Sequence, residues 1–342
     1  MKMTQNKKTV HGCLWLILMG LGTILFTPLL SLINLPSGYP FFTALILSYI
    51  SIRKVWGRPQ RKSLVTAIVS AFALSFLFVF VVIFFLGKSS NTEKSFTGSE
   101  HVQRTYIYQG ADSVAVYTSN RLWRGYYGKT YTGALTIREP DFLAQQYNKT
   151  KYDPLKADNF WGGLYAHLSN SDTPYLDLVL HTFEDIGRTN TLNRLEFAEM
   201  VVSCIQDIPY AYIFSQTCED VKNSEPEVAR FLKSCPACCK GEVGYGVQCV
   251  LAFLQGLKGD CDTRTVILYS ILKHFNYDVA ILNSDFYRHS ILGVNIPASG
   301  DYKLHRGKRY YLWETTAKYF KIGEMAPRME DLSHWDIVLL SK

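Results

Sequence analysis

The sequence predicts an α+β protein that begins with three membrane-spanning helices. Two uncharged runs, residues 14–35 and 64–86, hold 22 and 23 residues, and a third, residues 36–52, holds 17. The two longer runs are each sufficient to cross about 30 Å of hydrocarbon as a helix, and the third is at the short limit. A strand-like segment, a helical segment and a further group of strands follow in turn.

Charge is distributed unevenly along the chain. Residues 1–86 contain no Asp or Glu and eight Lys or Arg, whereas the remainder holds 28 basic and 29 acidic residues. The basic residues gather before the first run and between the second and third, so the positive-inside rule predicts three crossings, with a re-entrant second segment as the alternative. We therefore expect an integral membrane protein whose N-terminal helices contact the lipid bilayer and whose remaining residues are extracytoplasmic. The near-neutral remainder argues against a nucleic-acid partner.

Composition divides the chain into three regions. Residues 1–86 form the expected membrane anchor. Residues 87–191 form a linker and a mixed region, in which Tyr, Val, Thr and Trp alternate with polar residues over 105–137 before a helical pattern begins near Asp141. This pattern ends at Pro209. Residues 192–342 form the expected catalytic domain.

Seven cysteines follow the expected anchor. In an oxidising compartment, an odd number predicts up to three disulfides and one free thiol. Unpaired structural cysteines are one alternative, and zinc bound at the Cys235-x-x-Cys238-Cys239 spacing is another. The seven are Cys204, Cys218, Cys235, Cys238, Cys239, Cys249 and Cys261.

Cys261 is the candidate nucleophile. The preceding Asp260 is a suitable N-cap for a helix with apolar residues at helical spacing, which puts Cys261 in the first turn. The helix dipole and free backbone N–H groups there favour a thiolate over a thiol. A cysteine at a helix start is more often a packing residue, so this signal alone is weak.

His289 and Glu314 are the candidate base and orienting acid. Residues 278–282, 289–296 and 307–314 have strand composition. If the second and third pair as an antiparallel hairpin with Ile296 opposite Gly307, then His289 lies directly opposite Glu314. Opposed Cβ atoms are about 5 Å apart, so the carboxylate can fix the imidazole tautomer. The alternative is a surface ion pair with little effect on stability.

These residues lie in a segment, 194–322, that resembles the transglutaminase-like superfamily. The resemblance implies a papain-like arrangement, with the nucleophile helix packed on an antiparallel sheet and a triad of Cys261, His289 and Glu314. Glu314 departs from the family's usual Asp. The implied activity is acyl transfer or amide hydrolysis through a thioester, on a protein or peptide substrate and without a metal or organic cofactor. The matching stretches are Ile205-Gln206-Asp207-Ile208-Pro209-Tyr210, Lys258-Gly259-Asp260-Cys261-Asp262, Arg288-His289-Ser290 and Tyr311-Leu312-Trp313-Glu314-Thr315-Thr316.

Two further side-chain roles and two rival functions remain open. Gln248 is a candidate oxyanion donor, although a loop or cap role is the commoner one. Asp262 and Arg264 are expected to pair beside the nucleophile. The rival functions are an extracytoplasmic cysteine peptidase or amidase, and an inactive transglutaminase-like scaffold that binds a partner.

Overall fold

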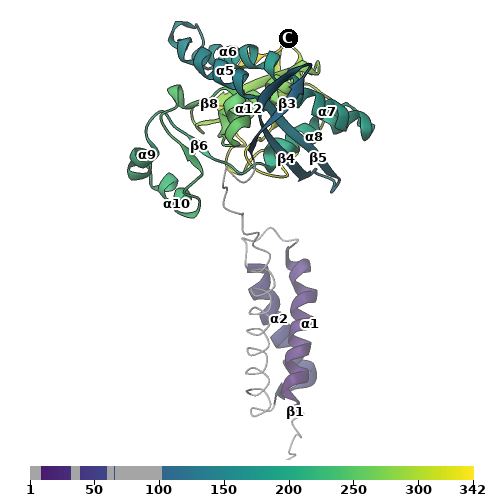
Figure 1. Cartoon of the computed structure of the whole chain (residues 1–342). Helices are drawn as coiled ribbons and strands as arrows, with labels where there is room; N and C mark the ends of the chain where they lie inside the picture. The colour runs from purple at the N-terminus through teal and green to yellow at the C-terminus, as the bar shows by residue number, and fades with distance from the viewer. Residues whose placement is uncertain (1–8, 32–38, 60–64, 66–101) are drawn as a thin grey trace, which may run out of the picture. The chain divides into compact units, whose positions relative to one another are not determined.

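The computed structural model describes residues 9–31, 39–59, 65 and 102–342 (Figure 1). The chain divides into two units, Met1–Thr92 and Glu93–Lys342. The second unit takes in both the expected mixed region and the expected catalytic domain, because side chains from both contribute to one buried core.

The described part of the first unit consists of two helices and a short strand pair. The helices pack against each other, with the rings of Trp15 and Tyr49 edge to face at 5.8 Å. The strands pair in parallel, with Thr9 opposite Arg58. The elements are β1 (Thr9–Val10), α1 (Gly12–Ser31), α2 (Tyr39–Trp56) and β2 (Arg58–Pro59).

The predicted membrane anchor is wrong for the part of the chain that the structure describes. Over those residues, no helix combines the length and the apolar content needed to cross a bilayer. The prediction counted uncharged residues, whereas α2 also takes Arg53 and Lys54 into its last turn and buries a polar side chain, Ser48. The third expected span, 64–86, lies outside the described residues apart from Val65. The assignment as an integral membrane protein with an extracytoplasmic domain rested on these spans and is withdrawn with them.

The second unit is α+β, as the sequence predicts. It begins with an antiparallel meander of three strands, in which β4 pairs with both neighbours. Helices that follow this sheet in the sequence pack on it: α7 contacts β5, and α8 contacts β4. The elements of this part are β3 (Gln103–Gln109), β4 (Asp112–Arg124), β5 (Thr130–Arg138), α5 (Glu139–Lys151), α6 (Phe160–Asp172), α7 (Asp177–Thr189) and α8 (Arg194–Asp207), with short 3₁₀ turns at Pro154–Lys156 and Thr173–Tyr175.

A segment rich in short elements follows α8. It contains a two-residue parallel strand pair and two small helices, and it ends at the helix that precedes Cys261. Its elements are β6 (Tyr212–Ile213), α9 (Cys218–Ser224), α10 (Pro226–Ser234), β7 (Cys239–Lys240), a 3₁₀ turn at Gly244–Gly246 and α11 (Val250–Gly256).

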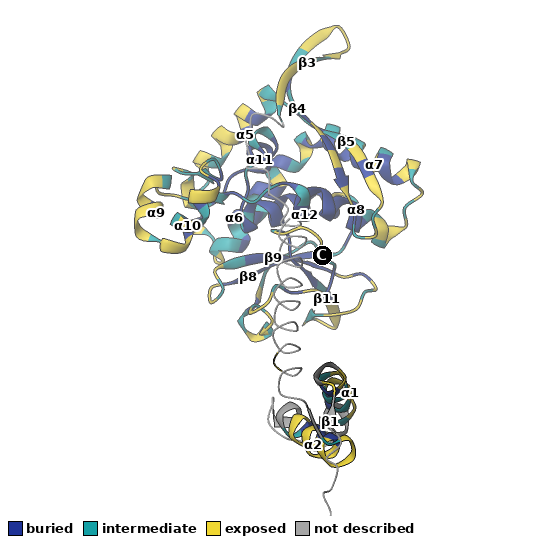
Figure 2. Cartoon of the chain, turned by 90° about the horizontal axis from the view of Figure 1, so that it is seen from below, coloured by how far each residue is buried: buried dark blue, intermediate teal, exposed yellow. Residues whose placement is uncertain are grey.

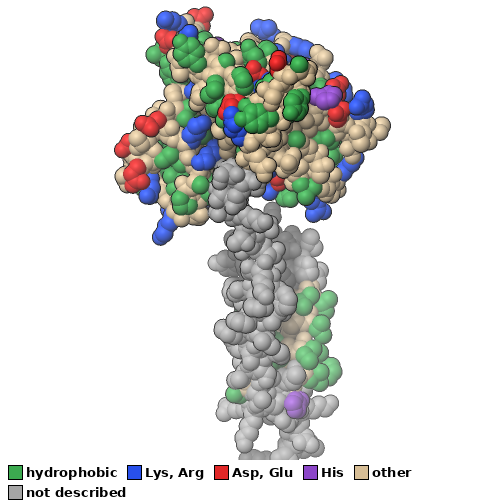
Figure 3. All heavy atoms as spheres, in the orientation of Figure 1, with side chains coloured by type: hydrophobic (Ala, Val, Ile, Leu, Met, Phe, Trp, Pro, Cys, Tyr) green, Lys and Arg blue, Asp and Glu red, His purple; other side chains and the backbone are tan. Residues whose placement is uncertain are grey.

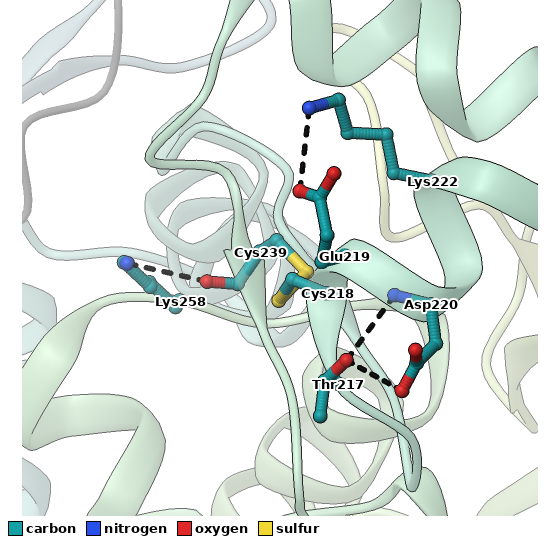
Figure 4. Close-up of a disulfide and its surroundings, with 7 residues drawn as sticks. All are labelled: Thr217, Cys218, Glu219, Asp220, Lys222, Cys239 and Lys258. Carbon is teal, nitrogen blue, oxygen red and sulfur yellow. Dashed lines mark hydrogen bonds and ion pairs between the residues drawn. A yellow bond between two sulfur atoms is a disulfide. The ribbon is translucent and has the colours of Figure 1, made fainter.

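Two disulfides hold this segment together. Cys218 at the start of α9 bonds to Cys239 in β7 (Figure 4). Cys235 bonds to Cys238. The zinc alternative is wrong for these cysteines, since all of them are consumed by the two bonds. The sequence allowed a third disulfide, but Cys204, Cys249 and Cys261 are free and buried.

The last third of the unit is one helix on a five-stranded antiparallel sheet with the order β10-β11-β9-β8-β12. The helix, α12, contacts β8 and β9 on one side and α6, α8 and α11 on others, and it is buried along most of its length (Figure 2). The elements are α12 (Cys261–His274), β8 (Val279–Ser284), β9 (His289–Val294), β10 (Tyr302–His305), β11 (Lys308–Trp313), a 3₁₀ turn at Leu332–His334 and β12 (Asp336–Leu340).

The surface of this unit carries charges of both signs. On the face drawn in Figure 3, Lys and Arg side chains are interspersed with Asp and Glu. This mixture is what the near-equal basic and acidic counts after residue 86 require.

The guanidinium of Arg264 joins α8 to the start of α12 and is fully buried. Its Nε donates to the carbonyl of Gly259 at 2.9 Å, and Nη1 donates to Ile205 at 2.8 Å. Its Nη2 donates to Ile208 and Pro209, both at 2.6 Å. The last carbonyls of a helix have no partner within the helix and carry a partial negative charge. A buried cation at this end therefore holds α8 in place.

We predict that Arg264→Met lowers the free energy of unfolding by about 3 kcal/mol, because the buried carbonyls of Ile208 and Pro209 lose the donor that Arg264 supplies. Urea denaturation of the full chain measures the change. Arg230→Met, which removes an exposed guanidinium from α10, is the control and should change stability little. Equal stability of the two variants would contradict a structural role for Arg264.

Candidate active site

Cys261 is the first residue of α12, as predicted. Asp260 is the N-cap, and its carboxylate accepts hydrogen bonds from the Thr263 backbone N–H at 3.1 Å and the Thr263 hydroxyl at 2.8 Å. This cap fixes where the helix begins and therefore where the thiol lies. The side chain is largely buried, with 8% of Cys261 exposed.

His289 and Glu314 contact each other, as the sequence led us to expect. His289 opens β9 and Glu314 directly follows β11, and His289 Nε2 lies 2.9 Å from Glu314 Oε2. The other carboxylate oxygen, Oε1, accepts the N–H groups of Thr315 at 2.9 Å and Thr316 at 2.8 Å and the Thr316 hydroxyl at 2.6 Å. Because Nε2 is engaged, Nδ1 is the ring nitrogen available to a second group.

The strand register that predicted this contact is wrong by two residues. In the structure Trp313 lies opposite Leu292, so continuing the register would set Glu314 opposite Ile291 rather than His289. A shift of two residues keeps every side chain on the same face of the sheet. Residues offset diagonally by two remain within reach of long side chains, and the glutamate makes the contact.

The sulfur of Cys261 lies at the His289–Ser290 segment. The backbone N–H of Ser290, the residue after His289, lies close enough to this sulfur to act on the pKa of the thiol. The helix α12 packs on β9, which carries both residues. Nucleophile, base and acid candidates are thus gathered from three elements.

The predicted preference of Cys261 for the thiolate form is not what its surroundings favour. Burial, followed by the nearby carboxylates of Asp262 and Asp260, raises the pKa of the Cys261 thiol well above its ordinary value. The N–H of Ser290 acts in the opposite direction but is outweighed. The resting group is therefore a thiol, and its ionisation requires a base.

The pKa of Glu314 is shifted in the opposite direction, below its ordinary value. Burial alone would raise the pKa of its carboxyl, but the hydrogen bond and charge of His289, together with the Thr316 donors, lower it to about 2. Glu314 is therefore a carboxylate at neutral pH. A fixed negative charge therefore lies beside Nε2 of His289.

A buried network of polar side chains lies next to the candidate site and includes Tyr165, Asp262 and Ser290. The hydroxyls of Tyr165 and Ser290 both donate to Asp262 Oδ1. Ser290 Oγ also lies 2.9 Å from Asn283 Oδ1, and Asn283 Nδ2 donates to the Tyr165 hydroxyl at 2.9 Å. The expected pair of Asp262 with Arg264 is therefore not formed, because each finds buried partners elsewhere. The network fixes the backbone of β9 beside the nucleophile.

Gln206 supports Glu314 from α8. Its Nε2 donates to the Glu314 carbonyl at 2.6 Å and to the Phe320 carbonyl at 3.0 Å. Its Oε1 accepts from the Tyr126 hydroxyl at 2.8 Å. Gln206 lies in the stretch that carried the family resemblance, but its contact with Glu314 spans 108 positions and has no local signal.

Gln248, the oxyanion candidate, has other partners in this structure. Its Nε2 donates to the carbonyl of Lys258, and its Oε1 accepts from Lys240 Nζ at 2.9 Å. Its amide thus braces the loop that leads to Cys261. The geometry favours this loop-supporting role over direct contact with an oxyanion.

Aromatic side chains flank the thiol. Burial raises the pKa of Tyr210 and of Tyr212, and proximity to Cys261 adds to both rises. Tyr212 also packs edge to face on Phe231 of α10, with ring centroids 5.2 Å apart. These half-buried rings form an apolar wall that the sequence analysis did not identify.

A cavity of about 770 Å³ lies elsewhere and does not belong to this site. It is lined by residues of α7 and by Ser270, Lys273 and His274 near the C-terminal end of α12. Cys261 is at the N-terminal end of the same helix, about 20 Å away at 1.5 Å per residue. Within the described ranges, no group of three or more His, Cys, Asp and Glu side chains is arranged to hold a metal ion.

Comparison with known proteins adds no relative: no protein-family model, curated protein or solved structure matches this chain.

We predict that Glu314→Gln lowers the free energy of unfolding by roughly 3 kcal/mol near neutral pH, the equivalent of a pKa lowered from 4.5 to about 2. A lowered folded-state pKa stabilises the fold above 4.5, and this contribution is lost as the pH falls toward 2. The difference in the free energy of unfolding between Glu314→Gln and the wild type should therefore narrow as the pH falls from 4.5 toward 2. Urea denaturation at several pH values measures it, with the exposed Glu330→Gln as control. A difference independent of pH would contradict this account.

Proposed function

We propose that this chain is a cysteine-dependent acyl-transfer enzyme of the transglutaminase-like kind, acting on amide bonds through a thioester at Cys261. The observation that carries the proposal is the His289–Glu314 hydrogen bond of 2.9 Å, made by a residue of β9, the strand on which the helix of Cys261 packs. Nucleophile, base and orienting acid are the minimum set for covalent acyl transfer.

In the proposed first half-reaction, His289 Nδ1 takes the thiol proton while the sulfur of Cys261 attacks the amide carbonyl carbon. The carbonyl electron pair moves to oxygen. The proposed donors to this oxyanion are backbone N–H groups at the start of α12 other than that of Thr263, which Asp260 accepts. Collapse of the intermediate reforms the carbonyl and breaks the carbon–nitrogen bond. The departing amine receives the proton from His289.

In the proposed second half-reaction, a water or an amine attacks the thioester. His289 takes a proton from the attacking group, and the sulfur departs and is reprotonated. Water yields a carboxylic acid and amine yields a new amide, so hydrolase and transferase share every protein residue and differ in the acceptor.

Two electrostatic observations support this order of events. The raised pKa of Cys261 leaves the thiol protonated at rest, so a base is required. The lowered pKa of Glu314 keeps a negative charge beside His289, which stabilises the imidazolium formed when the ring accepts the proton.

One observation favours a second candidate, a non-catalytic scaffold of the same fold. The thiol is largely buried and its pKa is raised, and a structural cysteine has the same properties. Selective acylation of Cys261 distinguishes the enzyme from the scaffold.

We predict that p-nitrophenyl acetate acetylates Cys261 of the full chain and that Cys261→Ala gains no acetyl group at this position. Glu314→Gln should slow the acetylation by orders of magnitude, because it keeps the side-chain size but loses the charge that stabilises imidazolium. Peptide mass spectrometry locates and times the modification. Cys249→Ala removes another buried thiol and should leave the rate unchanged.

Undiminished acetylation of Glu314→Gln would show that this residue is not the orienting acid. Absence of acetylation at Cys261 in the wild type would favour the scaffold. Release of the acetyl group with and without an added primary amine then separates hydrolase from transferase.

A further inference from the structure

Residues 210–238, which we call the cover segment, contact both sides of the candidate active site. On the nucleophile side, the backbone N–H of Ala211 donates to the carbonyl of Gly259, two residues before the candidate nucleophile, at 3.2 Å. On the base side, Oε1 of Glu225 lies 3.5 Å from Nη2 of Arg288, the residue directly before the candidate base. The cover segment therefore reaches from the loop that carries the thiol to the turn that carries the imidazole.

Aromatic side chains of the cover segment lie where it meets the nucleophile loop. Tyr210 and Tyr212, on either side of Ala211, pack edge to face on Phe231 of α10, with ring centroids 6.2 and 5.2 Å apart. The thiol behind them is largely buried, with 8% of Cys261 exposed, and burial is the main cause of its raised pKa. A protonated and covered thiol reacts slowly, so a change in the cover changes the reactivity of the nucleophile.

The two helices of the cover segment bury few side chains. Val221 is buried in α9, and Val228 and Leu232 are buried in α10. The two helices pack on each other. Elements with few buried apolar contacts open locally at a low cost in free energy. The position of these helices therefore depends strongly on the covalent bond that ties them to the next strand.

That bond is the Cys218–Cys239 disulfide, which joins the start of α9 to β7 (Figure 4). Cys239 is also the register partner of Tyr212 in the β6–β7 pair. One residue of β7 thus holds both the helices of the cover and the strand that carries its tyrosine. Opening this bond frees α9, whereas the Cys235–Cys238 bond still closes the turn after α10.

The two disulfides differ in their access to solvent. Cys218 and Cys239 are both partly exposed, while Cys235 and Cys238 are buried. A disulfide is opened by a thiolate that reaches one of its sulfur atoms, so exposed bonds exchange more readily than buried ones. A small thiol should therefore open the Cys218–Cys239 bond first.

We propose that Cys218–Cys239 is a thiol–disulfide exchange site for a small thiol, and that opening it uncovers Cys261. The thiolate of one small thiol attacks a sulfur of the bond and forms a mixed disulfide with that cysteine. The other cysteine leaves as a thiolate and takes a proton. A second small thiol attacks the mixed disulfide and releases the first cysteine, which also takes a proton. Two small thiols are thereby oxidised to one disulfide, and their two protons end on the two cysteines. The uncovering rests on the proposed role of Cys261 as the nucleophile.

A titration of the full chain with glutathione tests the proposal. After each step the reductant is removed under nitrogen, and iodoacetamide addition to every cysteine is followed by peptide mass spectrometry. Cys218 and Cys239 should become reactive at lower glutathione concentrations than Cys235 and Cys238. Over the same range the alkylation rate of Cys261 should rise at least about tenfold, because a less buried thiol is more ionised at a given pH.

Two double variants separate this bond from its neighbour. Cys218→Ser/Cys239→Ser lacks the bond without any reductant, so its Cys261 should react as fast as in the reduced wild type and should not respond to glutathione. The matched control, Cys235→Ser/Cys238→Ser, should keep the slow rate and respond to glutathione as the wild type does. The titration of the wild type carries the test alone should the first variant fail to fold.

Cys204 and Cys249 are free and buried, so their alkylation reports unfolding and should stay slow throughout. Acceleration at these thiols equal to that at Cys261 would show that the whole fold opens, and would overturn the proposal. So would an unchanged rate at Cys261 once the Cys218–Cys239 bond is open. The readout is alkylation before and after reduction, whereas acetylation tests the proposed function, so the two can fail independently.

Discussion

The fold depends most on the buried guanidinium of Arg264. It is the one side chain that ties the end of α8, the loop before Cys261 and the first turn of α12 to a common point through four backbone carbonyls. Burial lowers the pKa of Arg264 to about 10, so the group remains charged at neutral pH. Replacing this cation removes the donor of the Ile208 and Pro209 carbonyls that follow α8, which is costly. The position of the nucleophile therefore depends on an interaction that does not touch it.

The candidate site combines a thiol of raised pKa with a histidine that contacts an ionised glutamate. Burial, with the nearby carboxyl groups of Asp262 and Asp260, keeps Cys261 protonated, while Glu314 remains ionised next to His289. Tyr165 and the polar network around Asp262 hold β9, the strand that carries His289 and Ser290, in position.

Local signals predicted the parts of the site, and long-range contacts decided how they fit. The N-cap Asp260 and the strand composition around His289 correctly located α12 and β9. The register failed because the connection between β9 and β11 contains β10, which turns into β11 through Arg306 and Gly307, both with positive φ. Three of the four partners of Arg264 lie 55–59 positions away along the chain, and no periodicity in the sequence reveals them. The two membrane spans that fall on described residues failed because lack of charge was taken for sufficient apolar length.

The central claim is that Cys261 reacts only with the help of His289, and the pH dependence of its alkylation tests this most directly. The rate of iodoacetamide addition to Cys261 is followed by peptide mass spectrometry, which separates it from the other thiols. The account predicts that His289→Ala lowers the alkylation rate of Cys261 near neutral pH at least about a hundredfold. The variant should regain its reactivity only at strongly alkaline pH, where the thiol ionises without a base. An unchanged rate and pH profile in His289→Ala would contradict it.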